Sequence, residues 1–293
     1  MRIDKNRVRE AKKSSYLSIL SNSLIAIAKG TAGILGASFA LIADAIESAT
    51  DVFTSLLLIL GINYATRPAD HNHPYGHGKA ETLITFIIVG FLVISSIFIA
   101  YQSIENIRSD SQEIPEPYTL VVLAAVVIIK EVLYRIQLRN SKKTKSSSIN
   151  ADAWHHRSDA VTSLAAFIGI SISILMGPGY EKAEDWSALF ASAFILYNAY
   201  MIFRPALGEL MDEDLHKELV NEVRNVAEKV EGVENTEKCF IRKSGMFHHV
   251  DLHVRVDGEI TVTEGHDIAH MLKDKLLDDI PEISDVLIHI EPN

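Results

Sequence analysis

Six long apolar stretches constrain the fold of this chain more than any other feature. They cover residues 16–35, 37–65, 81–107, 118–138, 148–176 and 185–207. Each supplies the ~20 residues that an α-helix needs to cross a hydrocarbon core ~30 Å thick. Because a backbone in lipid must satisfy its own hydrogen bonds, the stretches predict an all-α bundle of six membrane helices. The second and fifth stretches are the least apolar, so we expect them to face the bundle interior.

The pattern changes after residue 209. Residues 216–230 and 264–277 are spaced as amphipathic helices, whereas residues 239–241, 250–256 and 286–290 are typical of short strands. This order predicts a small α+β domain with the succession αββαβ. We therefore expect a six-helix transmembrane domain at residues 1–209 and a cytoplasmic domain at residues 210–293.

Charge is distributed unevenly and predicts the orientation of the chain. Residues 212–293 hold 20 acidic and 9 basic residues, whereas the whole chain has a net charge of −10. An acidic domain speaks against nucleic-acid binding and attracts cations. Basic residues precede the first apolar stretch and separate the fourth from the fifth, which places both termini in the cytoplasm of a multi-pass protein of the cell (inner) membrane. The single cysteine, Cys239, excludes an intramolecular disulfide and a thiolate metal cluster.

One polar motif occurs twice inside the apolar stretches. Its first copy has Asp44 and Asp51, and its second copy, 108 residues later, has Asp152 and Asp159. Each copy continues with a Thr-Ser pair. Repetition of ionisable residues inside the membrane indicates a transport pathway, because such residues are costly in lipid and mark ion routes.

Two pairs at helical spacing lie around this motif. Glu47 with Asp51, and His155 with Asp159, are four residues apart and therefore share a helix face. With a rise of ~1.5 Å per residue, both pairs reach about the same depth near the middle of the membrane. Three carboxylates and one imidazole there suit a zinc-like ion. The alternative is a set of buried polar groups satisfied by hydrogen bonds between helices.

Carboxylates this close repel one another, so at least one should hold a proton when no metal is bound. Arrival of a metal ion would release that proton. The site therefore predicts an exchange of metal for protons. Asp44 and Asp152 lie one turn or more outside the pairs and either line the path or make structural hydrogen bonds.

Two further ligand clusters lie outside the membrane stretches. The loop of residues 68–81 contains Asp70, His73 and His77, and Gly76 permits a tight turn that brings them together. The tail offers six candidate ligands from three elements: His249, Asp251, His253, His266, His289 and Glu291. Ordinary solvated surface residues are the alternative for both clusters.

On these residues the chain resembles the cation diffusion facilitator family, in particular its bacterial zinc/iron-type metal exporters. The resemblance rests on four segments: Leu41-Ile42-Ala43-Asp44-Ala45, the loop from Asp70 to Glu81, His155-x-x-x-Asp159, and the tail from His249 to His289. It implies a homodimer whose metallochaperone-like cytoplasmic domain follows six membrane helices. It also implies export of Zn²⁺ and related ions in exchange for protons by alternating access.

The resemblance assigns roles to individual residues. Glu47, Asp51, His155 and Asp159 fall on the transport site, and Asp70, His73 and His77 fall on the loop site. His249, Asp251, His266 and His289 fall on regulatory metal sites of the tail, with His253 and Glu291 as additional candidates. Lys79 and Asp212 match an interlocking ion pair at the hinge of the dimer.

Glu47 departs from the family pattern, in which Asp or His is usual at the first position of the transport site. Three carboxylates with one imidazole form a hard ligand set, so Fe²⁺, Mn²⁺, Co²⁺ and Cd²⁺ stay open beside Zn²⁺. A passive metal channel and a non-transporting metal sensor or scaffold are alternatives of other classes. The chain has no nucleotide loop, nucleophile elbow or zincin motif, which speaks against an enzyme. We expect no prosthetic group, only metal ions as substrate and as structural or regulatory ligands.

Overall fold

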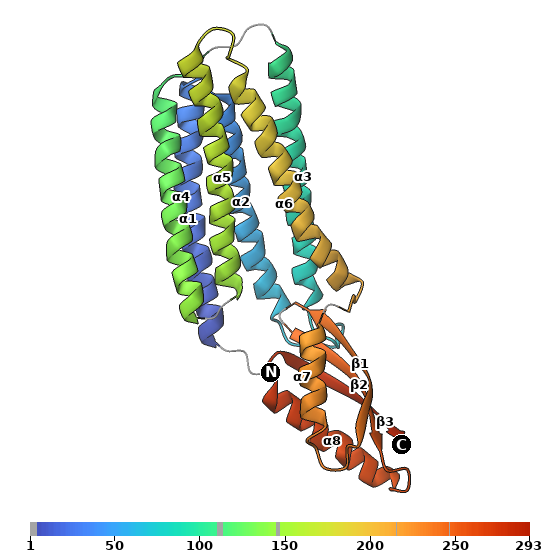
Figure 1. The fold of residues 1–293 in the computed structure, drawn as a ribbon. Coiled ribbons are helices and arrows are strands. Elements are labelled where there is room, and N and C mark those ends of the chain that lie inside the picture. The colour runs from blue at the N-terminus through green and yellow to red at the C-terminus, as the bar shows by residue number, and fades with distance from the viewer. Residues whose placement is uncertain (1–4, 110–113, 145–146, 215, 246) are drawn as a thin grey trace. The chain divides into compact units, whose positions relative to one another are not determined.

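A computed structural model describes residues 5–109, 114–144, 147–214, 216–245 and 247–293. Its elements follow one another as α1 (Lys5–Leu35), α2 (Phe39–Ala65), α3 (Lys79–Arg108), α4 (Tyr118–Thr144), α5 (Ser147–Met176), α6 (Ala183–Leu210), α7 (Lys217–Ala227), β1 (Asn235–Ser244), β2 (Phe247–Val256), α8 (Val262–Asp279) and β3 (Ile283–Pro292) (Figure 1). The chain divides into two compact units. One comprises Asp4–Leu60 with Phe86–Ile202, and the other includes Gly61–Thr85 with Phe203–Asn293.

The helical unit exposes many apolar side chains and buries charged ones beside an apolar core. Leu24 and Ile34 expose 62% and 72% of their surface, whereas Lys29 and Lys130 are fully buried. This combination is unusual for a protein in water, and it suits helices surrounded by lipid. The predicted helical membrane region is confirmed.

Among the described residues, four segments are long and apolar enough to cross a membrane: Phe39–Ala65, Lys79–Arg108, His155–Met176 and Ala183–Leu210. A shorter apolar segment, Ile19–Leu35, lies in α1. The α4 helix carries Lys130 and Glu131 within its length. The first helix begins at Lys5, earlier than the apolar pattern predicted, because the charged residues before the first stretch are helical too.

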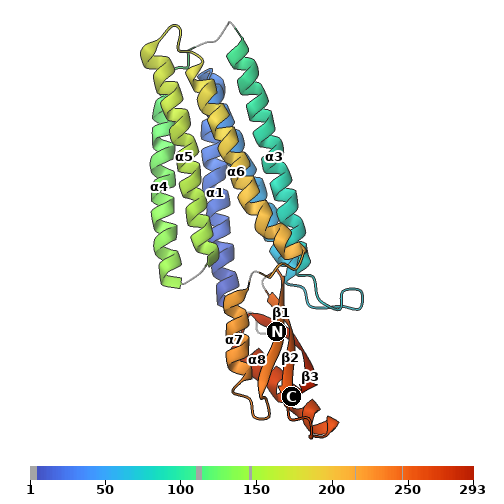
Figure 2. The same ribbon diagram turned by 45° about the vertical axis from the view of Figure 1, so that its right-hand side comes forward.

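The helices α1, α4 and α5 lie side by side in both views, and α3 lies beside α6 (Figures 1 and 2). The hydroxyl of Ser96 on α3 donates to the carbonyl of Ser192 on α6 at 2.7 Å. On α2, Phe53 packs against Phe91 of α3 with ring centroids 4.7 Å apart. The α2 helix also contacts α1 and α5 through the polar residues described below.

The start of α2 is fixed by polar caps. Ser38 Oγ accepts a hydrogen bond from the amide of Leu41 and donates one to the Glu184 carboxylate at 2.8 Å. Glu184 also accepts from the amide of Phe39 at 3.3 Å. Together they satisfy amides that the first turn of a helix leaves free. These caps fix the position at which α2 begins, and hence the depth of its acidic residues.

The second unit contains a three-stranded sheet in the order β1-β2-β3, with β1 antiparallel and β3 parallel to β2. Side chains of β2 alternate between buried and half-buried along its length. Val250 and Leu252 point into a core that also contains Leu272 and Leu276 of α8 and Val223 of α7. The helices therefore cover one face of the sheet, and the αββαβ order predicted from the sequence is confirmed. The strands are longer than the predicted ones.

Candidate metal sites

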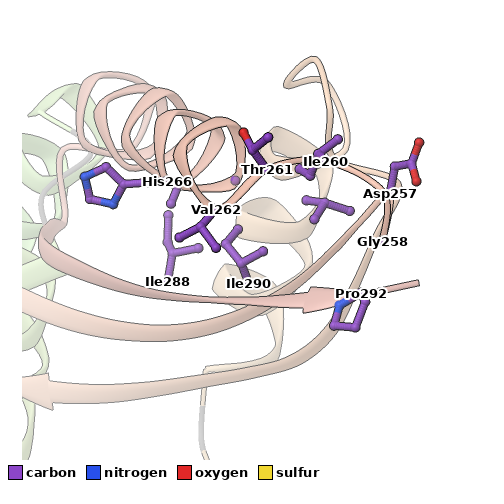
Figure 3. Close-up of a pocket in the computed structure, with 12 residues that line it drawn as sticks. Asp257, Gly258, Ile260, Thr261, Val262, His266, Ile288, Ile290 and Pro292 are labelled. Carbon is purple, nitrogen blue, oxygen red and sulfur yellow. The ribbon is translucent and has the colours of Figure 1, made fainter.

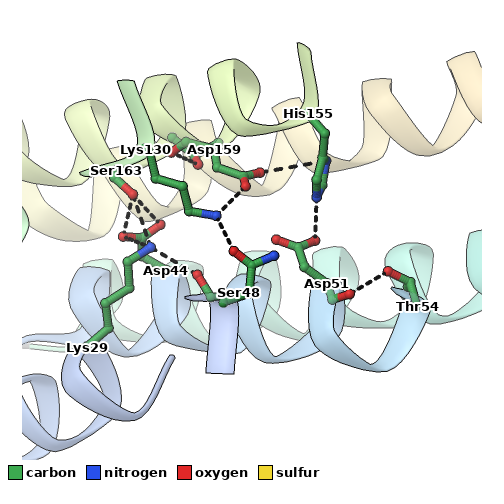
Figure 4. A network of polar contacts seen from close by, with 11 residues as sticks. Lys29, Asp44, Ser48, Asp51, Thr54, Lys130, His155, Asp159 and Ser163 are labelled. Atoms are coloured by element: carbon green, nitrogen blue, oxygen red, sulfur yellow. Dashed lines mark hydrogen bonds and ion pairs between the residues drawn. The ribbon is translucent and has the colours of Figure 1, made fainter. Parts of the chain in front are cut away.

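Inside the helical unit, one carboxylate of α2 meets an imidazole and a carboxylate of α5 (Figure 4). His155 Nε2 lies 3.5 Å from Asp51 Oδ1, and His155 Nδ1 lies 3.8 Å from Asp159 Oδ1. One ligand atom from each of these three residues lies within 4.8 Å of the others. Both carboxylates are buried. Asp51, His155 and Asp159 are called the transport cluster below.

One carboxylate oxygen of the transport cluster lacks a hydrogen-bond partner. Asp51 Oδ2 is buried and accepts no hydrogen bond from the described residues. A buried carboxylate oxygen without a partner is costly, and a bound cation removes that cost. The fourth expected ligand, Glu47, is buried on the preceding turn of α2 but does not belong to the close group. The structure therefore brings together three of the four expected residues.

A lysine occupies one side of the transport cluster. Lys130 of α4 is fully buried and forms an ion pair with Asp159 Oδ2. Its ammonium group also donates to Asn22 Oδ1 of α1 at 2.9 Å. The interpretation of the sequence missed both residues. An isolated lysine in an otherwise apolar stretch was the signal that could have found Lys130, because such a lysine needs a buried acceptor.

A second buried lysine lies beside the cluster. Lys29 of α1 pairs with Asp44 Oδ2 at 2.8 Å, and its ammonium donates to Ser48 and Ser163 at 3.0 and 3.1 Å. Ser163 in turn donates to Asp44 at 2.8 Å. Asp44 thus takes part in an ion pair that joins α1, α2 and α5. The side chain of Asp152, its counterpart in the repeat, lies outside the described residues.

The loop between α2 and α3 holds the second cluster. His73 Nδ1 lies 3.0 Å from Asp70 Oδ1, and His77 Nε2 lies 3.4 Å from Asp70 Oδ2. The turn depends on Gly76, whose φ of 82° favours glycine and whose amide donates to the His73 carbonyl at 2.9 Å. His77 is buried, and its Nδ1 accepts no hydrogen bond within the described part of the chain. The three predicted loop residues therefore come together.

Electrostatics keep the loop carboxylate ionised. Hydrogen bonds from the His73 side chain and backbone, and from the Asn72 backbone, lower the pKa of Asp70 below its usual value. An ionised carboxylate is the form that binds a metal ion. His71, in the same loop, is exposed and lies outside the group.

The loop is packed against the β1–β2 hairpin. A Cβ atom on Gly78 would lie 2.4 Å from Ser244 Oγ and 2.5 Å from its carbonyl oxygen, so no larger residue fits there. Lys79 Nζ lies 3.1 Å from Asp212 Oδ1, which forms the ion pair that the resemblance implied. Glu209 accepts hydrogen bonds from Thr82 and Lys243 at 2.8 and 3.1 Å. These contacts join the loop, the end of α6 and the hairpin.

The third cluster lies on the face of the sheet away from α8. His253 and His289 are paired neighbours on β2 and β3, with ring centroids 4.8 Å apart. Glu291 Oε1 lies 2.6 Å from His253 Nδ1 and 3.7 Å from His289 Nε2. Hydrogen bonds, chiefly that with His253, lower the pKa of Glu291 to about 2. This arrangement of two imidazoles and a carboxylate suits zinc-type ligation.

The other expected tail ligands lie elsewhere. Asp251 forms an ion pair with Arg242 at 3.2 Å. His249 faces Tyr75 of the loop with ring centroids 6.2 Å apart, and lines a cavity of about 320 Å³ with Asp285. Burial and the nearby Arg242 lower the pKa of His249. A neutral imidazole is therefore available there, outside the ligand group formed by the third cluster.

His266 lies on the opposite side of the sheet from the third cluster. It borders an apolar pocket between the start of α8 and the inner face of β3, where Ile288 and Ile290 point (Figure 3). Because strand side chains alternate, His289 points the other way. His266 instead packs against His270, one turn later, with ring centroids 4.5 Å apart. The sequence interpretation missed His270.

Comparison with protein families identifies both parts of the chain. The model of the cation efflux transmembrane domain matches residues 15–211, and that of the cation efflux protein cytoplasmic domain matches residues 215–293. The C-terminal domain of MamM, a solved structure 28% identical to this chain, covers 27% of it with a TM-score of 0.26, and all of that structure is covered.

Whole-chain relatives come from bacteria and plants. The manganese efflux system protein MneP of Bacillus subtilis is 31% identical over 96% of both chains. Metal tolerance protein C1 of Arabidopsis thaliana is 31% identical over 97% of this chain and 63% of its own length. Magnetosome protein MamB of Magnetospirillum gryphiswaldense is 27% identical over 90% and 88%. The chain therefore belongs to the cation diffusion facilitator family, whose members are membrane transporters of metal cations and not enzymes.

Proposed function

We propose that this protein exports a divalent transition-metal ion in exchange for protons, with the transport cluster as the binding site in the membrane. The observation that carries the proposal is the group of Asp51, His155 and Asp159, whose ligand atoms lie within 4.8 Å of one another and whose two carboxylates are buried. The unpartnered oxygen of Asp51 supports a cation there. Glu47 is proposed to complete the ligand set when metal binds.

The charge of the cluster supports coupling to protons. A divalent ion adds two positive charges to a site whose carboxylates are removed from water. When the ion leaves, that charge has to be replaced, because unpaired carboxylates are unstable at low dielectric. Protons entering from outside supply the replacement, and alternating access of the site to the two sides of the membrane makes the exchange directional.

Zn²⁺ is the first candidate cargo, since imidazole with carboxylates in a closed site suits it. Mn²⁺ is the second, for two reasons. The relative MneP is named a manganese efflux protein, and oxygen outnumbers nitrogen among the ligands. Fe²⁺, Co²⁺ and Cd²⁺ can bind the same ligand types, but no specific feature of the site favours them over Zn²⁺ or Mn²⁺.

The proposal extends to the organisation of the protein. Residues 1–209 form the membrane domain and residues 210–293 the cytoplasmic metal-binding domain of a homodimer in the cell (inner) membrane, with both termini in the cytoplasm. The loop cluster and the His253–His289–Glu291 cluster bind metal ions that regulate transport. Occupancy of the tail by metal then favours the transporting form of the dimer.

Purified protein in liposomes tests the proposal. We expect saturable uptake of Zn²⁺ or Mn²⁺ that depends on an opposing pH gradient and is abolished by a protonophore. Asp159→Asn removes a ligand and should abolish uptake, whereas Asp267→Asn, on the exposed side of α8, is a matched control that should not. Saturable uptake that persists in Asp159→Asn would disprove the site. Unsaturable flux without proton coupling would indicate a channel, and metal binding without flux would indicate a sensor.

A further inference from the structure

A fixed positive charge lies where the transport cluster is expected to accept its cargo. Lys130 is fully buried, and its ammonium group forms an ion pair with Oδ2 of Asp159. The other oxygen of the same carboxylate faces His155. The Lys130 side chain is removed from water in this structure, so its ammonium group depends on partners within the bundle. The Asp159 carboxylate can therefore pair either with the ammonium group of Lys130 or with a metal ion.

Asn22 provides the ammonium group with a second partner. Its Oδ1 accepts a hydrogen bond from Lys130 at 2.9 Å, and its side chain is 1% exposed. The amide is uncharged and comes from α1, outside the transport cluster. It can hold the ammonium group when Asp159 turns to another cation, so that Lys130 does not become a buried charge without a partner.

The second buried lysine shows what a purely structural pair looks like in the same bundle. Lys29 is surrounded by Asp44, Ser48 and Ser163, and Asp44 belongs to none of the ligand groups among the described residues. Lys130 differs because its carboxylate partner is itself a member of such a group. A structural role alone does not require the lysine to share that carboxylate.

We propose that Lys130 is a tethered cation that competes with the transported metal for Asp159, and that Asn22 holds the ammonium group while metal is bound. Rebinding of Lys130 to Asp159 then helps to expel the metal. Lys130 thereby sets the affinity of the site and the rate of release. The inference rests on the proposed transport function.

The test compares KM and kcat for Zn²⁺ uptake in liposomes between wild type and variants whose loop and tail sites are unchanged, so that a difference in KM reports the transport site. Lys130→Met should lower KM by about 10- to 100-fold, since removing one unit charge beside a bound cation in a low dielectric has an effect of this order. It should lower kcat as well, because release becomes slow. Asn22→Leu should raise KM, because it leaves the ammonium group with Asp159 alone.

The double variant Lys130→Met with Asn22→Leu tests whether Asn22 acts through Lys130. If Asn22 acts through Lys130, the double variant should have the KM of Lys130→Met, and Glu131→Gln, the adjacent charge on α4, should stay within about 2-fold of wild type. An unchanged or raised KM in Lys130→Met, or an effect of Asn22→Leu that persists in the double variant, would overturn the inference.

Two provisions keep the test decisive. Lys130→Gln retains a polar side chain without the charge and replaces Lys130→Met if the latter does not fold. If the wild type transports nothing, the proposed function fails, and calorimetric Zn²⁺ binding to the full chain in the background His77→Ala with Glu291→Gln still tests Lys130. Tighter binding in Lys130→Met would support the competition, and equal binding would overturn it.

Discussion

The Nε2 atom of His155 lies 3.5 Å from Oδ1 of Asp51, which joins an imidazole of α5 to a carboxylate of α2. The contact is made between two helices and not within one. A shift of one helical turn, about 5.4 Å, would separate the two atoms beyond the reach of a single metal ion. The three residues therefore come together only in one register of α2 against α5, and a shift of that register would take the proposed site apart.

The first prediction is that Asp51 contributes more to metal binding than Glu47 does. Asp51→Asn removes a member of the transport cluster and should raise KM for Zn²⁺ uptake more than about 100-fold. Glu47→Gln removes the proposed fourth ligand, which lies outside the close group until metal binds, and should raise KM less, by about 10-fold. Uptake kinetics in liposomes measure both, with Glu131→Gln as the control. Equal losses would mean that Glu47 contributes as much to metal binding as the ligands already in place.

The loop cluster predicts a metal ion that depends on His77. His77→Ala should lower the number of Zn²⁺ ions bound per chain by one, because it removes one of three ligands and opens the site. His71→Ala is matched in residue type and in loop, and should leave the number unchanged, since His71 lies outside the group. Equilibrium dialysis with elemental analysis gives the count. A loss in His71→Ala would show that the loop rearranges around the ion.

The sheet predicts which tail residues share an ion. His289→Ala or Glu291→Gln should remove one bound ion per chain, since both contact the same site. His266→Ala should not, because His266 lies on the α8 side of the sheet. The same dialysis measurement applies. If His266→Ala abolished the ion, the site would be completed by His266 from a second copy of the chain.

A buried imidazole predicts a pH dependence of tail stability. Burial and the neighbouring His216 lower the pKa of His248 from its ordinary value of 6.5, so the unfolded state takes up a proton before the folded state does. The stability contributed by neutral His248 is therefore complete above pH 6.5 and is lost as the pH falls from there through the lowered folded-state pKa. Once corrected for the intrinsic effect of pH, hydrogen exchange of β2 amides should become faster as the pH falls from 7.5 to 5.5.

The control for this prediction is His248→Phe, which keeps an aromatic ring in the core without a titrating group. Its exchange rates, corrected for the intrinsic effect of pH, should change less over the same interval. An identical acid sensitivity in His248→Phe would assign the effect to another group.

The Lys29–Asp44 pair predicts a large effect on stability. Lys29→Met leaves a buried carboxylate uncompensated and should lower the free energy of unfolding by about 3–5 kcal/mol. Lys29→Met combined with Asp44→Leu replaces the whole pair by apolar side chains and should recover most of the loss. Unfolding in detergent, titrated with dodecyl sulfate, measures both. A double variant no more stable than Lys29→Met would show that the serines, not the charges, dominate.

The fold was largely predictable from the sequence, because membrane thickness and strand alternation leave direct patterns in the chain. The approach of Asp51 to His155 and Asp159 was also predictable, since helical rise converts residue number into position along a helix. Lys29 and Lys130 were missed because one lysine changes the average hydropathy of a long apolar stretch very little. Their partners lie on other helices, and no local pattern identifies which helices touch.

The tail shows a second limit. His249, Asp251 and His253 lie on one face of the sheet, because side chains alternate along β2. Alternation could not tell that only His253 is adjacent to the histidine of β3, because that depends on the register of a parallel pair formed across α8. Nor could it place His266, whose helix covers the other face.

The close approach of Gly78 to Ser244 has a mechanical consequence. With no room for even a methyl group between them, the loop lies directly against the hairpin that joins β1 and β2. A displacement of the sheet would carry the loop ligands with it. In the proposed function, metal binding to the tail cluster would thereby also change the geometry of the loop cluster, without any ion passing between the two.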